Sequence, residues 1–147
     1  MTTSRIRAIL LALLVLAAAP RSLAAQAPLE GFIGSVARLW AAGDAGELAG
    51  LAPADGRILL DLGDGNAGAV EKRHVAAALR ELFSGRENVG VRPAQVTISG
   101  GEPLRGFGEL TWTSRVKGVS DAQTSTVYVG AVREGSAWKI RELRVLR

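Results

Sequence analysis

The stretch LRGFGELTWTSRVKGVSDAQTSTVYVGAVREGSAWKIRELRVL, residues 104–146, decides the fold class of this 147-residue chain. Apolar and polar residues alternate through it, so that Leu110 and Trp112 face one side of an extended chain and Thr111 faces the other. Two glycine-containing turns interrupt the alternation. The pattern therefore predicts three consecutive strands of an antiparallel sheet, over residues 104–117, 122–133 and 138–146.

The last of these strands changes phase within its length. Trp138 and Ile140 share one face of an extended chain, but Leu143 and Val145 fall on the other. One extra residue near position 141 would return all four apolar side chains to a single face. We therefore predict a β-bulge at positions 141–142, which would bend the strand.

Upstream of residue 84 the apolar residues repeat about every 3.6 positions, which is typical of amphipathic helices. The predicted helices cover about 29–42, a short segment beginning at Asp44, and about 69–83. Single strands are predicted at 57–62 and 91–99. Three N-terminal helices packed on a curved antiparallel sheet make an α+β fold.

The order of these elements and a few short segments resemble a known superfamily. The segments are Ala42–Leu48 at the first helix junction, Ala78–Phe83 at the end of the third helix, Trp138–Ile140 and Leu143–Val145. Together they resemble the nuclear-transport-factor-2-like (cystatin-like α+β cone) superfamily. More narrowly, they resemble a family of small exported bacterial domains of unknown function. The resemblance implies a cone-shaped fold and carries no established activity.

The first 25 residues have the plan of a secretory signal peptide. Arg5 and Arg7 precede an apolar run over 8–19, and small residues follow Pro20. The run is shorter than the roughly 20 residues that span a membrane. We therefore expect cleavage between about residues 24 and 27, a single domain over 28–147, and a periplasmic or secreted product without stable membrane insertion.

Net charge and cysteine content limit the function classes. The chain has 18 Lys+Arg against 14 Asp+Glu, and removal of the predicted leader would take away three arginines and no acid. The remaining chain would be nearly neutral, so we expect no nucleic-acid binding. With one histidine and no cysteine, neither a metal site nor a cofactor is expected.

Three residues are weak candidates for acid–base catalysis. His74 has the side chain whose pKa lies nearest neutrality, but its position suits the boundary of a helix face. Asp61 begins a glycine-rich loop that departs from the calcium-binding EF-hand pattern. Tyr128 lies on a late strand, so the proton-transfer set of the steroid isomerases in the resembled superfamily does not map onto this chain. We therefore expect no catalytic residues.

The expected function is binding rather than catalysis. The interior of the cone, as an open pocket or a filled core, is expected to be lined by some of Trp40, Leu79, Phe83, Trp112, Tyr128 and Trp138. The ligand would be a small apolar molecule or an envelope protein, bound through the cone or the sheet face. The alternative is a cofactor-independent isomerase, cyclase or hydrolase of the same fold.

One strand is apolar on both of its faces. Val127 and Val129 point opposite to Tyr128 and Val132, and an apolar face needs cover. We therefore predict a homodimer packed through the sheet.

Overall fold

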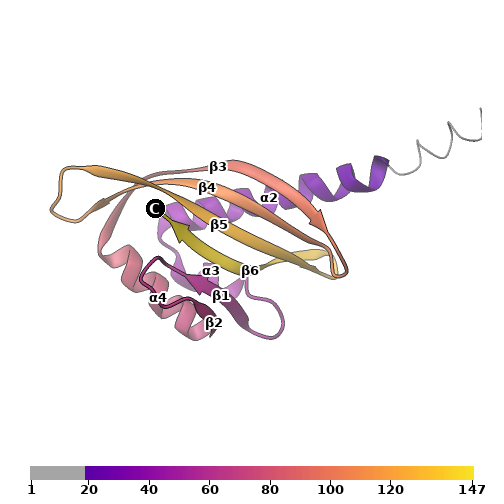
Figure 1. Cartoon of the computed structure of the whole chain (residues 1–147), viewed down its shortest axis with the longest axis horizontal. Coiled ribbons are helices and arrows are strands. Elements are labelled where there is room, and N and C mark those ends of the chain that lie inside the picture. Colours follow the sequence, from indigo (N-terminus) through magenta and orange to yellow (C-terminus); the bar gives the residue numbers. More distant parts are fainter. Residues whose placement is uncertain (1–18) are drawn as a thin grey trace, which may run out of the picture.

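The computed structural model describes residues 19–147. Its elements are α2 (Ala19–Ala42), α3 (Ala45–Gly50), β1 (Arg57–Asp61), β2 (Gly68–Glu71), α4 (Lys72–Ser84), β3 (Arg86–Gly100), β4 (Arg105–Val116), β5 (Ala122–Glu134) and β6 (Ala137–Leu146). The strands form one six-stranded sheet in the order β2-β1-β6-β5-β4-β3 (Figure 1). The predicted α+β class is confirmed.

The sheet is mixed, whereas the sequence pattern predicted an antiparallel one. Strand β1 pairs parallel with β6, with Leu60 opposite Leu143, and all other pairs are antiparallel. Strand β2 was not predicted, because its four residues lack a clear alternation. It pairs with β1 through Ile58 and Val70, so the third predicted helix begins at Lys72 rather than near 69.

The predicted bulge in β6 is confirmed. Gly130 of β5 lies opposite Glu142, whereas the next residue, Ala131, lies opposite Ile140. Arg141 is therefore the extra residue. Because of this insertion, the four apolar side chains of β6 that were out of phase all lie in the core, namely Trp138, Ile140, Leu143 and Val145.

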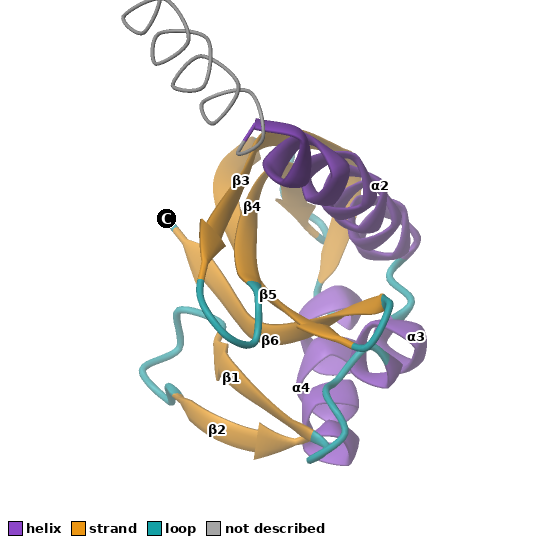
Figure 2. Ribbon diagram, turned by 90° about the vertical axis from the view of Figure 1, so that its right-hand side faces the viewer, coloured by secondary structure: helices purple, strands orange, loops and turns teal. Residues whose placement is uncertain are grey.

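The three helices lie on one face of the curved sheet (Figure 2). We call this the inner face, and the opposite side the outer face. Helix α2 crosses the sheet near Gly106 and Gly108 of β4, where a side chain would collide with the helix. A Cβ atom at Gly106 would lie 2.5 Å from Leu29 Cδ2, and one at Gly108 would lie 2.7 Å from side-chain atoms of Ile33. These two glycines therefore set how closely the helix approaches the sheet.

Helix α2 begins earlier than predicted. Within its N-terminal part Ala25 is buried, and the side-chain amide of Gln26 donates a hydrogen bond of 3.0 Å to the carbonyl oxygen of Val96. Residues 24–27, where cleavage was predicted, are thus helical and in contact with β3. Residues 1–18 of the predicted leader lie outside the described residues.

The two edges of the sheet differ in length. Strand β2 has only four residues, whereas β3 has 15. The register of β3 against β4 shifts at three places, between Asn88 and Gly90, between Pro93 and Gln95, and between Ile98 and Gly100. Strand β3 is thus a long edge interrupted by irregular pairing.

Candidate functional site

The interior between the helices and the sheet is filled by side chains. Three aromatic rings from α2, α4 and β4 pack edge to face, with 5.2 Å between the ring centroids of Trp40 and Phe83 and 5.4 Å between Trp40 and Trp112. Leu29 and Ile33, farther along α2, are fully buried against the two glycines of β4. This packing is that of a hydrophobic core.

Asn88 satisfies polar groups at the end of this core. Its amide nitrogen donates to the carbonyl oxygens of Trp40 and Ala41 at 2.9 and 3.0 Å, and its carbonyl oxygen accepts 2.7 Å from Trp112 Nε1. The carbonyl groups at a helix C-terminus have no partner inside the helix. Asn88 therefore joins the end of α2 to the sheet. This contact could not be predicted from the sequence, because a lone asparagine carries no sign of a long-range partner.

Most of the residues expected to line the cone lie in the core. Trp40, Leu79, Trp112 and Trp138 are buried, and Phe83 is half-buried against them. Tyr128, the sixth of the candidate lining residues, does not lie in this core. Its neighbours in the sheet are Glu109 and Arg144, and it points to the outer face, opposite to Val127 and Val129.

The candidate catalytic residues are not gathered in a cavity. His74 is exposed in the first turn of α4. Asp61 ends β1 and accepts a hydrogen bond of 3.0 Å from the backbone N–H of Gly63, which makes a turn. In the sheet, Arg144 of β6 lies opposite Asp61 of β1 on one side and opposite Tyr128 of β5 on the other. Arg144 therefore separates the two candidate residues.

The outer face combines an aromatic pair with a hollow. The rings of Phe107 and Tyr128 stack with 5.5 Å between centroids. Beside them lies a hollow of about 590 Å³, whose lining includes Arg105, Tyr128, Gly130, Val132 and Glu142. This volume is in the range of about 300–1,000 Å³ found for small-molecule sites. The outer face is the candidate functional site.

Two charged side chains of β6 neutralise each other on the outer face. Glu142 and Arg144 form an ion pair beside Tyr128. Burial raises the pKa of the Tyr128 hydroxyl above its usual value, and the negative charge of Glu142 raises it further. A hydroxyl with a raised pKa stays protonated at neutral pH, so Tyr128 can donate a hydrogen bond but is a poor base.

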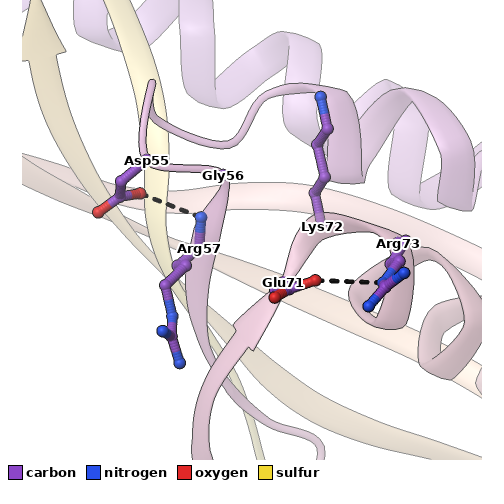
Figure 3. A pocket seen from close by; sticks show the side chains of 6 residues that line it. All are labelled: Asp55, Gly56, Arg57, Glu71, Lys72 and Arg73. Atoms are coloured by element: carbon purple, nitrogen blue, oxygen red, sulfur yellow. Dashed lines mark hydrogen bonds and ion pairs between the residues drawn. The ribbon is translucent and has the colours of Figure 1, made fainter.

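A second hollow, of about 460 Å³, lies where β1 begins and α4 starts (Figure 3). Its acids are already paired. Glu71 contacts Arg73 at 3.1 Å, and Asp55 contacts Arg141 at 2.8 Å. The hydrogen bond from Arg141 lowers the pKa of Asp55, and the backbone N–H of Arg57 lowers it further. We interpret this site as surface ion pairs that tie the bulge of β6 to the turn before β1.

The described residues contain no group of three or more His, Cys, Asp or Glu side chains that could hold a metal ion. Across residues 19–147, none of the helices is both long and apolar enough to cross a membrane.

No protein-family model matches the chain, and no curated protein matches it. Solved structures do share its fold. A DUF4783 family protein from Bacteroides ovatus aligns over 75% of this chain and 89% of its own, with a TM-score of 0.59 and 16% identity. A provisionally named scytalone dehydratase from Novosphingobium aromaticivorans aligns over 85% of this chain and 86% of its own, with a TM-score of 0.66 and 13% identity.

A designed protein of the nuclear-transport-factor-2 type also aligns, over 79% of this chain and 94% of its own, with a TM-score of 0.61 and 13% identity. At these identities the similarity establishes the fold alone. The chain therefore has the nuclear-transport-factor-2-like α+β cone fold, and the fold that the resemblance implied is confirmed. The fold carries no activity with it.

Proposed function

We propose that this protein is an exported, non-catalytic binding domain that acts through the outer face of its sheet. The observation that carries the proposal is the contrast between the two faces. The inner face is packed by α2, with Leu29 and Ile33 fully buried, whereas the outer face holds the stacked Phe107 and Tyr128 beside a large hollow.

The separation of the three candidate acid–base residues, His74, Asp61 and Tyr128, favours binding over catalysis. An isomerase, cyclase or hydrolase of this fold needs at least two ionisable groups facing one substrate. His74 lies on α4, and Asp61 is separated from Tyr128 by Arg144. No observation favours the enzymatic alternative.

Export is proposed from the order of residues in the N-terminal segment. The contacts of Ala25 and Gln26 with the rest of the fold favour cleavage at the early end of the predicted range, before Ala25. N-terminal sequencing of the protein recovered from the cell envelope or medium tests this proposal. A mature chain that begins at residue 25 is expected, and an N-terminus at Met1 would contradict export by cleavage.

Native mass spectrometry of the protein purified after expression of the whole chain tests the binding surface. We expect a bound species, either a small molecule or a further protein chain, on the unmodified protein. Replacing Phe107 and Tyr128 together by alanine is expected to remove it. Thr124→Ala, an exposed position on the far end of the outer face, is the matched control. Retention of the bound species by the double variant would contradict the proposal.

A further inference from the structure

We propose that the hollow on the outer face binds a small organic molecule with one carboxylate group, which the guanidinium group of Arg105 holds. This inference rests on the proposed function, because it takes the outer face to be the binding surface. The ligand class follows from the charges, the hydrogen-bond donors and the shape of the hollow.

The hollow contains one positive charge that no acid balances. Its charged lining residues are Arg105, Arg141 and Glu142. Arg141 contacts Asp55 at 2.8 Å, and Glu142 forms an ion pair with Arg144. Arg105 forms no ion pair with any residue that the structure describes. A ligand with a single negative charge would therefore complete the charge balance of the hollow.

A carboxylate matches a lone arginine better than a phosphate does. The planar guanidinium group can donate two parallel hydrogen bonds to the two oxygen atoms of a carboxylate. A phosphate monoester carries about two negative charges at neutral pH. Glu142, in the wall of the same hollow, would repel the second charge. The ligand is therefore a monoanion, and its carboxylate lies at the Arg105 end of the hollow.

The bulge of β6 supplies a second group of N–H donors. Arg141 is the extra residue of this bulge, and its side chain lines the hollow. Bulges often redirect a side chain beside a functional site. The contact of Arg141 with Asp55 uses one nitrogen, Nη1, of a group that has five N–H donors. Asp55 therefore orients the guanidinium group, and the remaining donors can bind a ligand.

The body of the ligand packs beside Tyr128 and Glu142. A Cβ atom placed at Gly130 would lie 3.4 Å from Glu142 Oε2 and 3.5 Å from Tyr128 Cε1, so these two side chains fill the space over the glycine. The ligand lies next to them, against the Tyr128 ring and against Pro103, which also lines the hollow. Glu142 can accept a hydrogen bond from a hydroxyl group on the ligand.

The outer face suits a small molecule better than a protein. A hollow of about 590 Å³ has the volume of a small-molecule site. Protein interfaces are built around clusters of buried aromatic and apolar anchors. Of the four large apolar residues that are exposed in the described part of the chain, only Leu146 adjoins Tyr128. The face therefore lacks the apolar cluster that a protein partner would need.

Matched ligands and matched variants test the proposal. The probes are para-hydroxybenzoate and para-hydroxybenzamide, which have nearly the same shape and differ in the negative charge. The protein, purified after expression of the whole chain and dialysed, is titrated at neutral pH and low ionic strength. Heteronuclear NMR of the arginine Nε–H groups follows binding. The variants are Arg105→Gln and a control, Arg92→Gln, which removes the same charge from an exposed residue of β3 outside the hollow.

We expect para-hydroxybenzoate to shift the Arg105 signal and to bind with a dissociation constant of about 1 mM or below. The amide should bind at least about tenfold more weakly, because it lacks the charge that strengthens hydrogen bonds to arginine. Arg105→Gln should weaken binding of the carboxylate by at least about tenfold and change the affinity of the amide by less than about twofold. Arg92→Gln should leave both affinities unchanged.

Two results would overturn the carboxylate ligand. One is equal binding of the acid and the amide, or binding of neither. The other is an Arg105→Gln variant that binds the acid as tightly as the unmodified protein does. In native mass spectrometry, a bound species that is lost on replacing Phe107 and Tyr128 but kept by Arg105→Gln would refute this inference and leave the proposed function standing. A bound species that both changes leave in place would refute both.

Discussion

The two faces of the sheet are built from the same strands but differ in how their side chains are constrained. On the inner face, two β4 glycines let α2 approach until Leu29 and Ile33 touch the backbone of the sheet. On the outer face, Phe107 and Tyr128 stack at the surface, and the ion pair of Glu142 with Arg144 lies beside Tyr128. The inner face therefore contributes most of the stability, and the outer face is less constrained by packing.

A buried charge on the inner side gives the largest expected difference between the faces. Leu79→Asp places an unpaired carboxylate in the core, where Leu79 is fully buried, and should cost at least about 4 kcal/mol of the free energy of unfolding. Leu146→Asp, at a 48% exposed residue of the outer face, should cost less than about 1 kcal/mol. Urea unfolding measures both. Equal losses would contradict the assignment of the faces.

Glycines on the two faces provide a finer comparison. A Cβ at Gly108 meets the buried Ile33 at 2.7 Å, whereas a Cβ at Gly130 meets Glu142 Cβ at 2.9 Å, and that side chain is only half-buried. Gly108→Ala should cost about 3 kcal/mol, because α2 must move. Gly130→Ala should cost about 2 kcal/mol, because the Cβ of Glu142 can move only with the backbone of β6, although no helix has to shift. Thermal unfolding of the two variants should preserve this order, and a reversed order would show that α2 packs less tightly than described.

The polar contact at the end of the core should have an intermediate effect. Asn88→Ala removes the side-chain partner of the Ala41 carbonyl and of the Trp112 indole N–H, and one of the two donors to the Trp40 carbonyl, for a cost of about 2 kcal/mol. Asn66→Ala, in an exposed loop, is the matched control. Urea unfolding and the near-ultraviolet circular dichroism of the tryptophans report the change. No difference from the control would mean that water replaces Asn88 without loss.

The smallest effect concerns Tyr128, which is the single tyrosine of the chain. Because burial raises its pKa in the folded state, the unfolded chain releases the proton first as the pH rises. Stability should therefore fall slightly above about pH 10, the usual pKa of tyrosine, and Tyr128→Phe should remove that part of the loss. The ultraviolet absorbance of tyrosinate follows the titration directly. Equal midpoints in the folded and urea-unfolded chains would contradict the described burial.

The periodicity of apolar residues predicted those elements that depend only on residues close together in the sequence. The out-of-phase Leu143 and Val145 of β6 were enough to predict the bulge, because the phase of a strand depends only on neighbouring residues. The parallel pairing of β1 with β6 was not predicted, since it joins segments about 80 residues apart. Strand β2 was missed because four residues are too few to show a period.

The candidate site was predicted only in part, and Tyr128 shows why. Its strand is apolar on both sides, so the alternation separates Val127 and Val129 from Tyr128 and Val132 without saying which set faces the helices. The answer depends on Gly106 and Gly108 of the neighbouring strand, which admit α2 on one side only. The stacking of Phe107 on Tyr128 depends on the register between β4 and β5. Neither relation is visible in one segment alone.

The irregular edge strand β3 has a consequence for how large any assembly can grow. Pro93 lacks a backbone N–H, and three register shifts interrupt the row of groups that an incoming strand would need. The opposite edge is only four residues long. Edges of these two kinds resist edge-to-edge pairing with strands of other chains, which is the contact that builds fibres. We therefore expect the edges of this sheet not to pair with those of other chains.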